Sequence, residues 1–278
     1  MRVRRERGWG EHGVVYAAVA AGSFRRYATY RIATVAGVFT NTVFGFIVAY
    51  TYIALWDERP HLGGYDQAQA LTFVWTAQAL LATAALMGGG GLDELQERIR
   101  TGDIAVDLYR PADLQLWWLA ADLGRAGLQL LGRGVAPMAV GALVFPLALP
   151  GDALTWGCFL LSVLFGVLVS FALRYLVALA SFWLLDGSGL AMISGLACMF
   201  FTGMVLPLRV FPGGSAEVVQ LLPWAAILQV PADVLMGVRS GDGLVRGLVF
   251  QAGWAGALLA LGRLVQSAAT RKVVVHGG

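Results

Sequence analysis

The sequence predicts an all-α membrane protein with six transmembrane helices, and three observations lead to this fold class. Hydrophobic residues make up 58% of the 278 residues, and charged residues make up only 13%. The mean hydropathy is +0.69, and the apolar residues fall into long runs separated by short polar breaks. A soluble core of this length does not bury so much apolar surface, whereas lipid accepts it. We therefore expect one transmembrane domain over residues 1–278.

Five apolar runs have the roughly 18 to 25 residues that a helix needs to cross a bilayer. They are residues 32–56, 68–87, 154–185, 189–206 and 244–261. Residues 126–149 form a sixth run if Arg133 is tolerated within it. Because Arg125 and Arg133 lie near the expected cytoplasmic end of this run, snorkelling to the headgroups is favoured over a functional role. Asp122 has the i,i+3 spacing to pair with Arg125.

The basic residues predict the orientation. Most of the 20 Lys and Arg residues lie in segments 1–31, 98–133 and 263–272, which fall on one side of a six-span topology. The positive-inside rule makes this side cytoplasmic, so both termini are expected there, in a multi-pass protein of the plasma (inner) membrane. The same bias accounts for the net charge of +3, so no nucleic-acid partner is expected.

Residues 1–31 are predicted to form a cytoplasmic interfacial N-terminus. A cleaved signal peptide is the alternative, but Glu11 and His12 stand where its apolar region would begin. Arg25 and Arg26 then follow the short apolar run closely. A retained amphipathic helix is favoured, with small apolar residues toward lipid: Val14, Ala18, Ala21 and Ala28.

The cytoplasmic break at 92–115 carries a short amphipathic helix. Leu92, Leu95 and Ile99 recur at helical spacing, and charged residues of both signs separate them. Gly102 is suited to end the helix, and Pro111 disfavours helix in the residue before it. A solvated loop and a docking element for a soluble partner explain this pattern equally well.

The outer break at 207–243 is rich in proline. Two apolar segments, 215–222 and 224–236, are too short to cross the bilayer. Backbone at membrane depth needs partners from protein or water, so both segments are expected to be re-entrant or interfacial. Such a plug suits an outer gate, and an amphipathic lid is the plainer alternative. The candidate gate residues are Pro207, Pro212, Pro223 and Trp224.

Motifs of enzyme chemistry are lacking. The glycine run at 87–91 is not followed by Gly-Lys-Ser/Thr and therefore is not a Walker motif. The three histidines lie outside the apolar runs, so a catalytic or metal site is not expected. Polar residues inside the spans include no proton-relay carboxylate, which argues against a proton- or ion-coupled carrier. The few hydroxyls and amides in an apolar bundle suit an amphipathic or lipid-like substrate, and they suit ordinary packing as well. The candidate path residues are Asn41, Thr42, Gln78, Ser194 and Thr202.

Taken together, these features resemble the ABC-2 type transporter permeases. The residues 100–111, Arg-Thr-Gly-Asp-Ile-Ala-Val-Asp-Leu-Tyr-Arg-Pro, are similar to the hallmark of this family after its second span. The Trp-Trp-Leu-Ala at 117–120, with Gly124 and Arg125, resembles a subgroup of uncharacterised permeases. The resemblance covers nearly the whole chain.

The resemblance implies a membrane subunit that pairs with a second permease, as a homodimer or a heterodimer, and with a separate ATPase that binds ATP and Mg. No cofactor is then bound by this chain. Break 92–115 becomes the coupling element that contacts the ATPase, through Leu95, Glu97, Ile99, Arg100, Gly102, Asp103, Leu108, Arg110 and Pro111. The expected function is ATP-driven export of an amphipathic or lipid-like substrate along a path between the permeases. A membrane scaffold or regulatory subunit without a transport path is the alternative.

Overall fold

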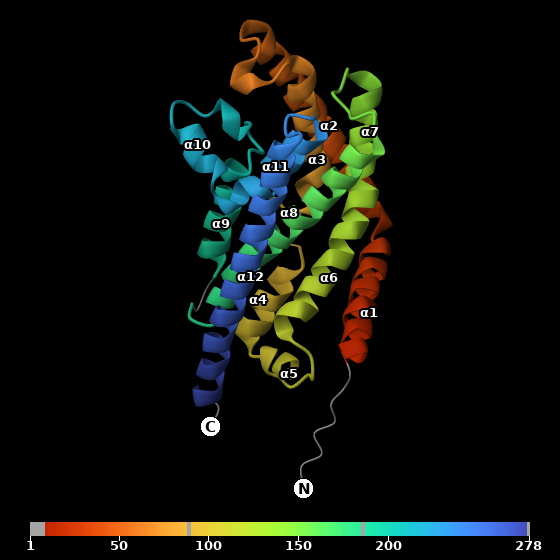
Figure 1. Ribbon diagram of the computed structural model, residues 1–278. Helices are drawn as coiled ribbons and strands as arrows, with labels where there is room; N and C mark the ends of the chain where they lie inside the picture. The colour runs from red at the N-terminus through yellow and green to blue at the C-terminus, as the bar shows by residue number, and fades with distance from the viewer. Residues whose placement is uncertain (1–8, 88–89, 185–186, 277–278) are drawn as a thin grey trace.

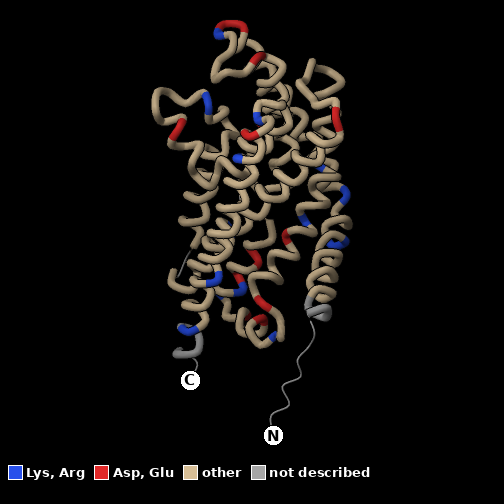
Figure 2. Tube along the Cα trace, viewed as in Figure 1, with Lys and Arg blue, Asp and Glu red and all other residues tan. Residues whose placement is uncertain are grey.

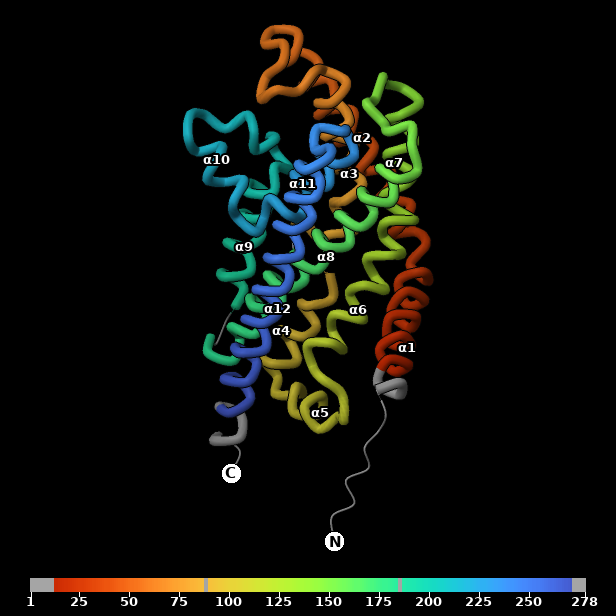
Figure 3. The backbone as a smooth tube through the Cα atoms, viewed as in Figure 1, coloured from red at the N-terminus to blue at the C-terminus, as the bar shows by residue number. Residues whose placement is uncertain are grey.

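The computed structural model describes residues 9–87, 90–184 and 187–276. Over these ranges the chain forms helices and turns and no β-strand, as predicted. Figure 1 shows an elongated bundle with its long helices side by side. The start of α1 and the last turns of α12 lie at the same end of the bundle as α5 (Figure 3). Residues 1–8 of the predicted interfacial N-terminus and residues 88–89 of the glycine run lie outside the described residues.

Within the described ranges, four helices are long and apolar enough to cross a membrane. Three of them match predicted spans: α2 (Arg31–Glu58), α8 (Ala153–Ala180) and α12 (Asp242–His276). The 28 residues of α2 extend over about 42 Å at 1.5 Å per residue, more than a hydrocarbon core of about 30 Å. Figure 2 shows charged residues gathered at the outer loops and at the end that carries α4 and α5.

The fourth long helix corrects the predicted boundaries of the third span. It runs from Leu114 to Val144 rather than over 126–149, so residues 114 and 115 of the predicted cytoplasmic loop are helical. The helix comprises α6 (Leu114–Gln129), the π-helical turn η2 (Leu130–Gly134) and α7 (Val135–Val144). Pro137 lies just beyond this wide turn. Because proline lacks an N–H and crowds the carbonyl four residues earlier, a local change of helical pitch accommodates it.

The count of six spans is not confirmed, because two predicted spans are shorter than expected. For 68–87 the structure has α3 (Gln67–Thr83), and for 189–206 it has α9 (Ser188–Phe201), followed by turns. Their 17 and 14 residues extend over about 25 and 21 Å. The helix α3 is buried from Ala70 to Leu80, so neighbouring helices rather than lipid surround most of it.

Trp75 lies at the centre of the bundle on α3 and is fully buried. Its ring contacts Phe46 and Phe145 at centroid distances of 5.5 and 6.0 Å. Gly45 of α2 and Gly141 of α7 face it so closely that a Cβ at either position would overlap the indole. The small residues of α2 therefore make room for a large core side chain, which fixes how α2, α3 and α7 pack.

The N-terminal helix α1 (Trp9–Ala28) lies along α6. The two backbones meet where Gly124 faces the carbonyl of Ala20, with no space for a Cβ. The hydroxyl of Tyr16 accepts a hydrogen bond of 3.0 Å from the backbone N–H of Asp113. Val14, Ala18, Ala21 and Ala28 are exposed on its other face. Contact of this face with lipid stays a prediction.

The outer break folds into four short helices, η3 (Leu208–Val210), α10 (Ser215–Gln220), η4 (Pro223–Ala226) and α11 (Gln229–Leu235). All of α11 is buried, and it packs on α8 and α3. A Cβ at Gly166 of α8 would lie 2.9 Å from the carbonyl oxygen of Ile227. Gln251 of α12 donates to the carbonyl of Ala226 at 2.7 Å. A side chain of α12 thus binds a backbone carbonyl of this segment, and a re-entrant position in the membrane stays a prediction.

Candidate functional site

The predicted coupling element consists of α4 (Leu92–Thr101) and α5 (Ile104–Leu108), joined by a sharp turn. Leu95 and Ile99 are buried on one face of α4, as predicted, and Leu108 is partly buried. Gly102 ends α4 in the left-handed conformation with φ of 87°, which a residue with a Cβ adopts at a cost. The buried face of α4 packs against α8, so the position of α4 is tied to a long helix of the bundle.

Asp107 anchors α5, and the sequence analysis missed it. Its side chain is only 4% exposed and accepts from Arg98 at 2.8 Å and from Arg110 at 3.1 Å. The guanidinium of Arg110 also lies 4.9 Å from the ring centroid of Trp117. Arg110 therefore holds α5 against α6, besides its expected role toward an ATPase.

The outer face of the coupling element carries the other predicted residues. Glu97, Arg100, Asp103 and Pro111 are exposed. Arg100 pairs with Glu97 at 2.6 Å, and its hydrogen bonds lower the pKa of Glu97. Asp103 accepts from the hydroxyl of Thr101 at 2.9 Å. These charges are thus partly satisfied within the chain.

Two large side chains protrude from the turn of α5. Tyr109 is 90% exposed and Val106 is 60% exposed. Exposed aromatic residues beside charged ones are characteristic of binding surfaces. Helical periodicity gave no sign of this, because Tyr109 follows a helix of only five residues.

A buried ion cluster lies where α3 ends and the chain turns toward α4. Asp122 of α6 accepts from Arg125 at 2.8 Å and from Arg174 of α8 at 2.7 Å. Arg125 also donates to the carbonyl oxygens of Ala82 and Thr83, at 2.6 and 3.0 Å. The predicted pairing of Arg125 with Asp122 is confirmed, but Arg125 is buried rather than snorkelling. It satisfies the free carbonyls at the end of α3.

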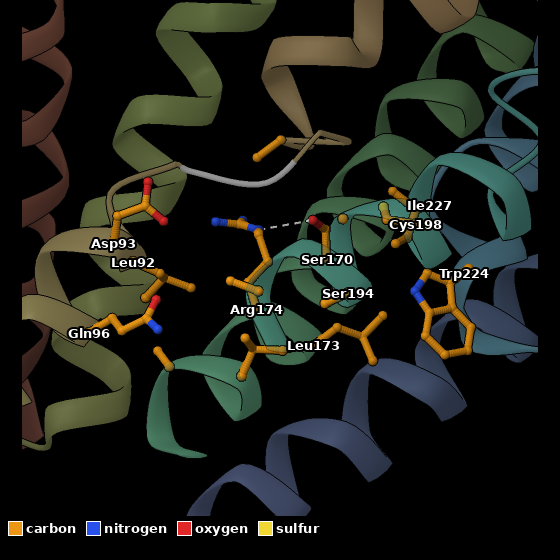
Figure 4. A pocket seen from close by; sticks show the side chains of 15 residues that line it. Leu92, Asp93, Gln96, Ser170, Leu173, Arg174, Ser194, Cys198, Trp224 and Ile227 are labelled. Atoms are coloured by element: carbon orange, nitrogen blue, oxygen red, sulfur yellow. Dashed lines mark hydrogen bonds between the residues drawn. The ribbon is translucent and has the colours of Figure 1, made fainter. Parts of the chain in front are cut away.

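A cavity of about 50 Å³ opens between the coupling element and the outer break. Figure 4 shows Arg174 in the middle, with Leu92 and Gln96 of α4 on one side and Trp224 of η4 on the other. Ser194 of α9 also lines it. This space is large enough for a few water molecules and too small for a lipid-like molecule.

The five predicted path residues are not gathered in this cavity. Ser194 lines it, whereas Asn41 and Gln78 meet elsewhere, through a 3.1 Å hydrogen bond from Asn41 to the carbonyl of Gln78. The side-chain oxygen of Gln78 is buried and has no hydrogen-bond partner among the described residues. Thr202 donates to the carbonyl of Cys198 at 2.7 Å, and Thr42 is partly buried on α2. A path along these residues stays a prediction.

A second buried cluster secures the outer break. Asp233 of α11 is fully buried and accepts from Tyr65, from Arg209 at 3.0 Å and from Arg239 at 3.2 Å. Gln229 donates to the Tyr65 hydroxyl at 2.6 Å. Burial and the charge of Asp233 raise the pKa of Tyr65, so its hydroxyl stays a donor. The cluster joins the connection between α2 and α3 to the outer break.

The predicted gate residues have different environments. Pro207 precedes η3 and is buried, and Pro223 begins η4 and is also buried. Trp224 is partly buried at a centroid distance of 5.7 Å from Phe201. Pro212 is exposed in a turn. Trp224 is the gate candidate that faces the cavity, and gating by any of the four stays a prediction.

The long apolar helices and the amphipathic element between α3 and α6 define a multi-pass helical membrane protein. A family model described as "ABC-2 family transporter protein" matches residues 36–277. The chain belongs to this ABC-2 family, which confirms the resemblance found in the sequence. No curated protein and no solved structure matches the chain.

Proposed function

We propose that this chain is the permease subunit of an ATP-driven exporter in the plasma (inner) membrane, with both termini in the cytoplasm. A separate ATPase subunit would bind ATP and Mg and would supply the energy. Membership of the ABC-2 family supports the permease role and association with an ABC ATPase. The surface of α4 and α5 is the observation that carries the docking part of the proposal.

The docking surface consists of Glu97, Arg100, Asp103, Val106 and Tyr109. Its polar members offer charges of both signs, and Tyr109 offers a large rigid contact area. The surface rests on buried anchors, since Leu95 and Ile99 seat α4 and Asp107 holds α5. A movement of the ATPase subunit against this surface would be transmitted to α8 and to the ion cluster of Asp122.

A second permease would pack along α2 and α9. The helix α9 has no buried residue, and α2 buries a narrow stripe of residues three or four apart. Large apolar side chains stand exposed on both helices: Phe39, Phe44, Ile47, Leu190, Met192, Ile193, Leu196 and Phe200. An amphipathic or lipid-like substrate would move outward between the two subunits.

The test is purification of the tagged full-length chain from its native membranes in mild detergent, with identification of every stoichiometric partner. The wild type is compared with Val106→Ser/Tyr109→Ser on α5. The matched control is Val218→Ser/Leu221→Ser, which removes two exposed apolar side chains from the outer break.

We expect the wild type and the control to retain a soluble ATPase, with or without a second permease, and the α5 variant to lose it. Recovery of the wild type alone in several detergents would contradict the permease role and favour a scaffold. Retention of the ATPase by the α5 variant would contradict the docking surface but not the permease role.

A further inference from the structure

A cationic crevice of about 390 Å³ lies where α1 turns into α2 beside α6. Its wall combines the segment from Arg26 to Thr34 with Gln129 and Arg133. Arg133 is on the π-helical turn η2, where the wider pitch sets the direction of its side chain. Two tyrosines, Tyr27 and Tyr30, also line the crevice.

Gly37 of α2 makes room for Arg133. A Cβ at this position would overlap the Nε and Cζ atoms of the guanidinium. The Nε atom is buried and has no hydrogen-bond partner among the described residues. The sequence thus provides a fitted space for an arginine head at the side of a candidate membrane span.

The charges around the crevice do not balance Arg133. Arg26, the other cation of the wall, pairs with Glu94 at 3.1 Å. Among the described ion pairs, none includes Arg133. A partly buried guanidinium without a counterion is costly, and an anionic oxygen group that approaches it removes that cost.

The surroundings of Arg133 favour a phosphate group as its ligand. A planar guanidinium binds two phosphate oxygens at once. The first turn of α2 carries no acidic residue, and Tyr30 does not cap it through its side chain, so its free N–H groups add positive potential. The adjoining surface of α2 is apolar, with Ile32, Val35 and Phe39 exposed. A molecule with a phosphate head group and an acyl chain matches both the cationic crevice and the apolar surface of α2.

We propose that this crevice binds the phosphate of an anionic phospholipid, with Arg133 as the main ligand and the acyl chains along α2. The site stands on the geometry of α1, α2 and η2 alone and does not depend on transport. Soluble phosphate shares the same chemistry, and the experiment separates the two sources.

The experiment places the purified full-length chain in nanodiscs of phosphatidylcholine, with or without phosphatidylglycerol, and measures the thermal unfolding midpoint. A third arm adds inorganic phosphate to phosphatidylcholine discs. Arg133→Gln removes the ligand, and Gly37→Ala keeps the charge but displaces the guanidinium. The matched control is Arg246→Gln, which removes an exposed arginine near the start of α12.

Phosphatidylglycerol should raise the midpoint of the wild type and of Arg246→Gln, since a ligand that binds only the folded state stabilises it. This rise should be lost in Arg133→Gln and reduced in Gly37→Ala. In phosphatidylcholine alone, whose phosphate is neutralised by its own choline ammonium, Arg133→Gln should be at least as stable as the wild type, because it removes a charge that this lipid does not balance. An equal rise in all four proteins, or an equal rise with inorganic phosphate, would overturn the proposal.

Discussion

Two buried carboxylates lie near opposite ends of α3, and each is held by two arginines. In the cluster at the end of α3, here called the inner cluster, Asp122 pairs with Arg125 and Arg174, which are 3% and 11% exposed. At the outer end, Asp233 pairs with Arg209 and Arg239, which are 29% and 23% exposed. The arginines of the inner cluster are therefore less exposed to solvent than those of the outer cluster.

The two clusters also differ in what they join. The inner partners come from the long helices α6 and α8 and close the end of α3. The outer partners come from short segments and from the connection between α2 and α3, with Tyr65 and Gln229 as additional partners. We infer that the inner cluster fixes where the coupling element joins the bundle. The outer cluster is inferred to be a latch, meaning a contact that can open, because its partly exposed arginines can be hydrated when it does.

The largest effect is expected from Asp122→Asn. This change removes the buried carboxylate charge that Arg125 and Arg174 share, so the free energy of unfolding should fall by about 3–5 kcal/mol. Denaturation of the purified chain in one fixed detergent measures the difference. Glu58→Gln, an exposed change at the end of α2, is the control and should stay within about 0.5 kcal/mol. An equally small change for Asp122→Asn would show that the inner cluster does not stabilise the fold.

A smaller effect is expected from Asp233→Asn. Its arginines are partly hydrated, and the amide still accepts one hydrogen bond, so the loss should be about 1.5–3 kcal/mol. The same denaturation series gives the comparison with Asp122→Asn. A loss larger than that of Asp122→Asn would reverse the ranking of the two clusters.

The smallest effect is expected from Tyr65→Phe. This change removes one hydroxyl, while Asp233 keeps both arginines and Gln229, so the loss should be about 1 kcal/mol. Limited proteolysis of the outer break should nevertheless become faster, because the connection between α2 and α3 loses its contact with α11. Unchanged proteolysis would argue against the latch.

The sequence predicted α2 and α8 well, because long apolar runs with at most one charged residue in their interior are compatible with few structures other than a spanning helix. It placed the start of the third span too late, since Asp113 and Gln115, and then Asp122 and Arg125, interrupt the apolar pattern over the first part of the helix. In the structure Asp113 caps α6, by accepting from the N–H of Leu116 at 2.9 Å. Polar residues with specific partners at a helix start therefore resembled a loop.

The sequence predicted some features of the coupling element and of the Asp122 cluster, but not all of their contacts. Leu95 and Ile99 follow the helical period and are buried, and the i,i+3 pair of Asp122 and Arg125 was recognised. The partner Arg174 lies 52 positions from Asp122, and no local pattern links them. Asp107 did leave a signal, because it stands three residues after the buried Ile104 on a short helix.

The docking of an ATPase on α5 is tested most directly by cross-linking in native membranes. A photoreactive amino acid at position 109 is compared with one at position 61, an exposed position in the outer connection between α2 and α3. The account predicts an adduct with a soluble ATPase from position 109 and none from position 61. No ATPase adduct from position 109, or an adduct from position 61 alone, would contradict both the orientation and the proposed coupling element.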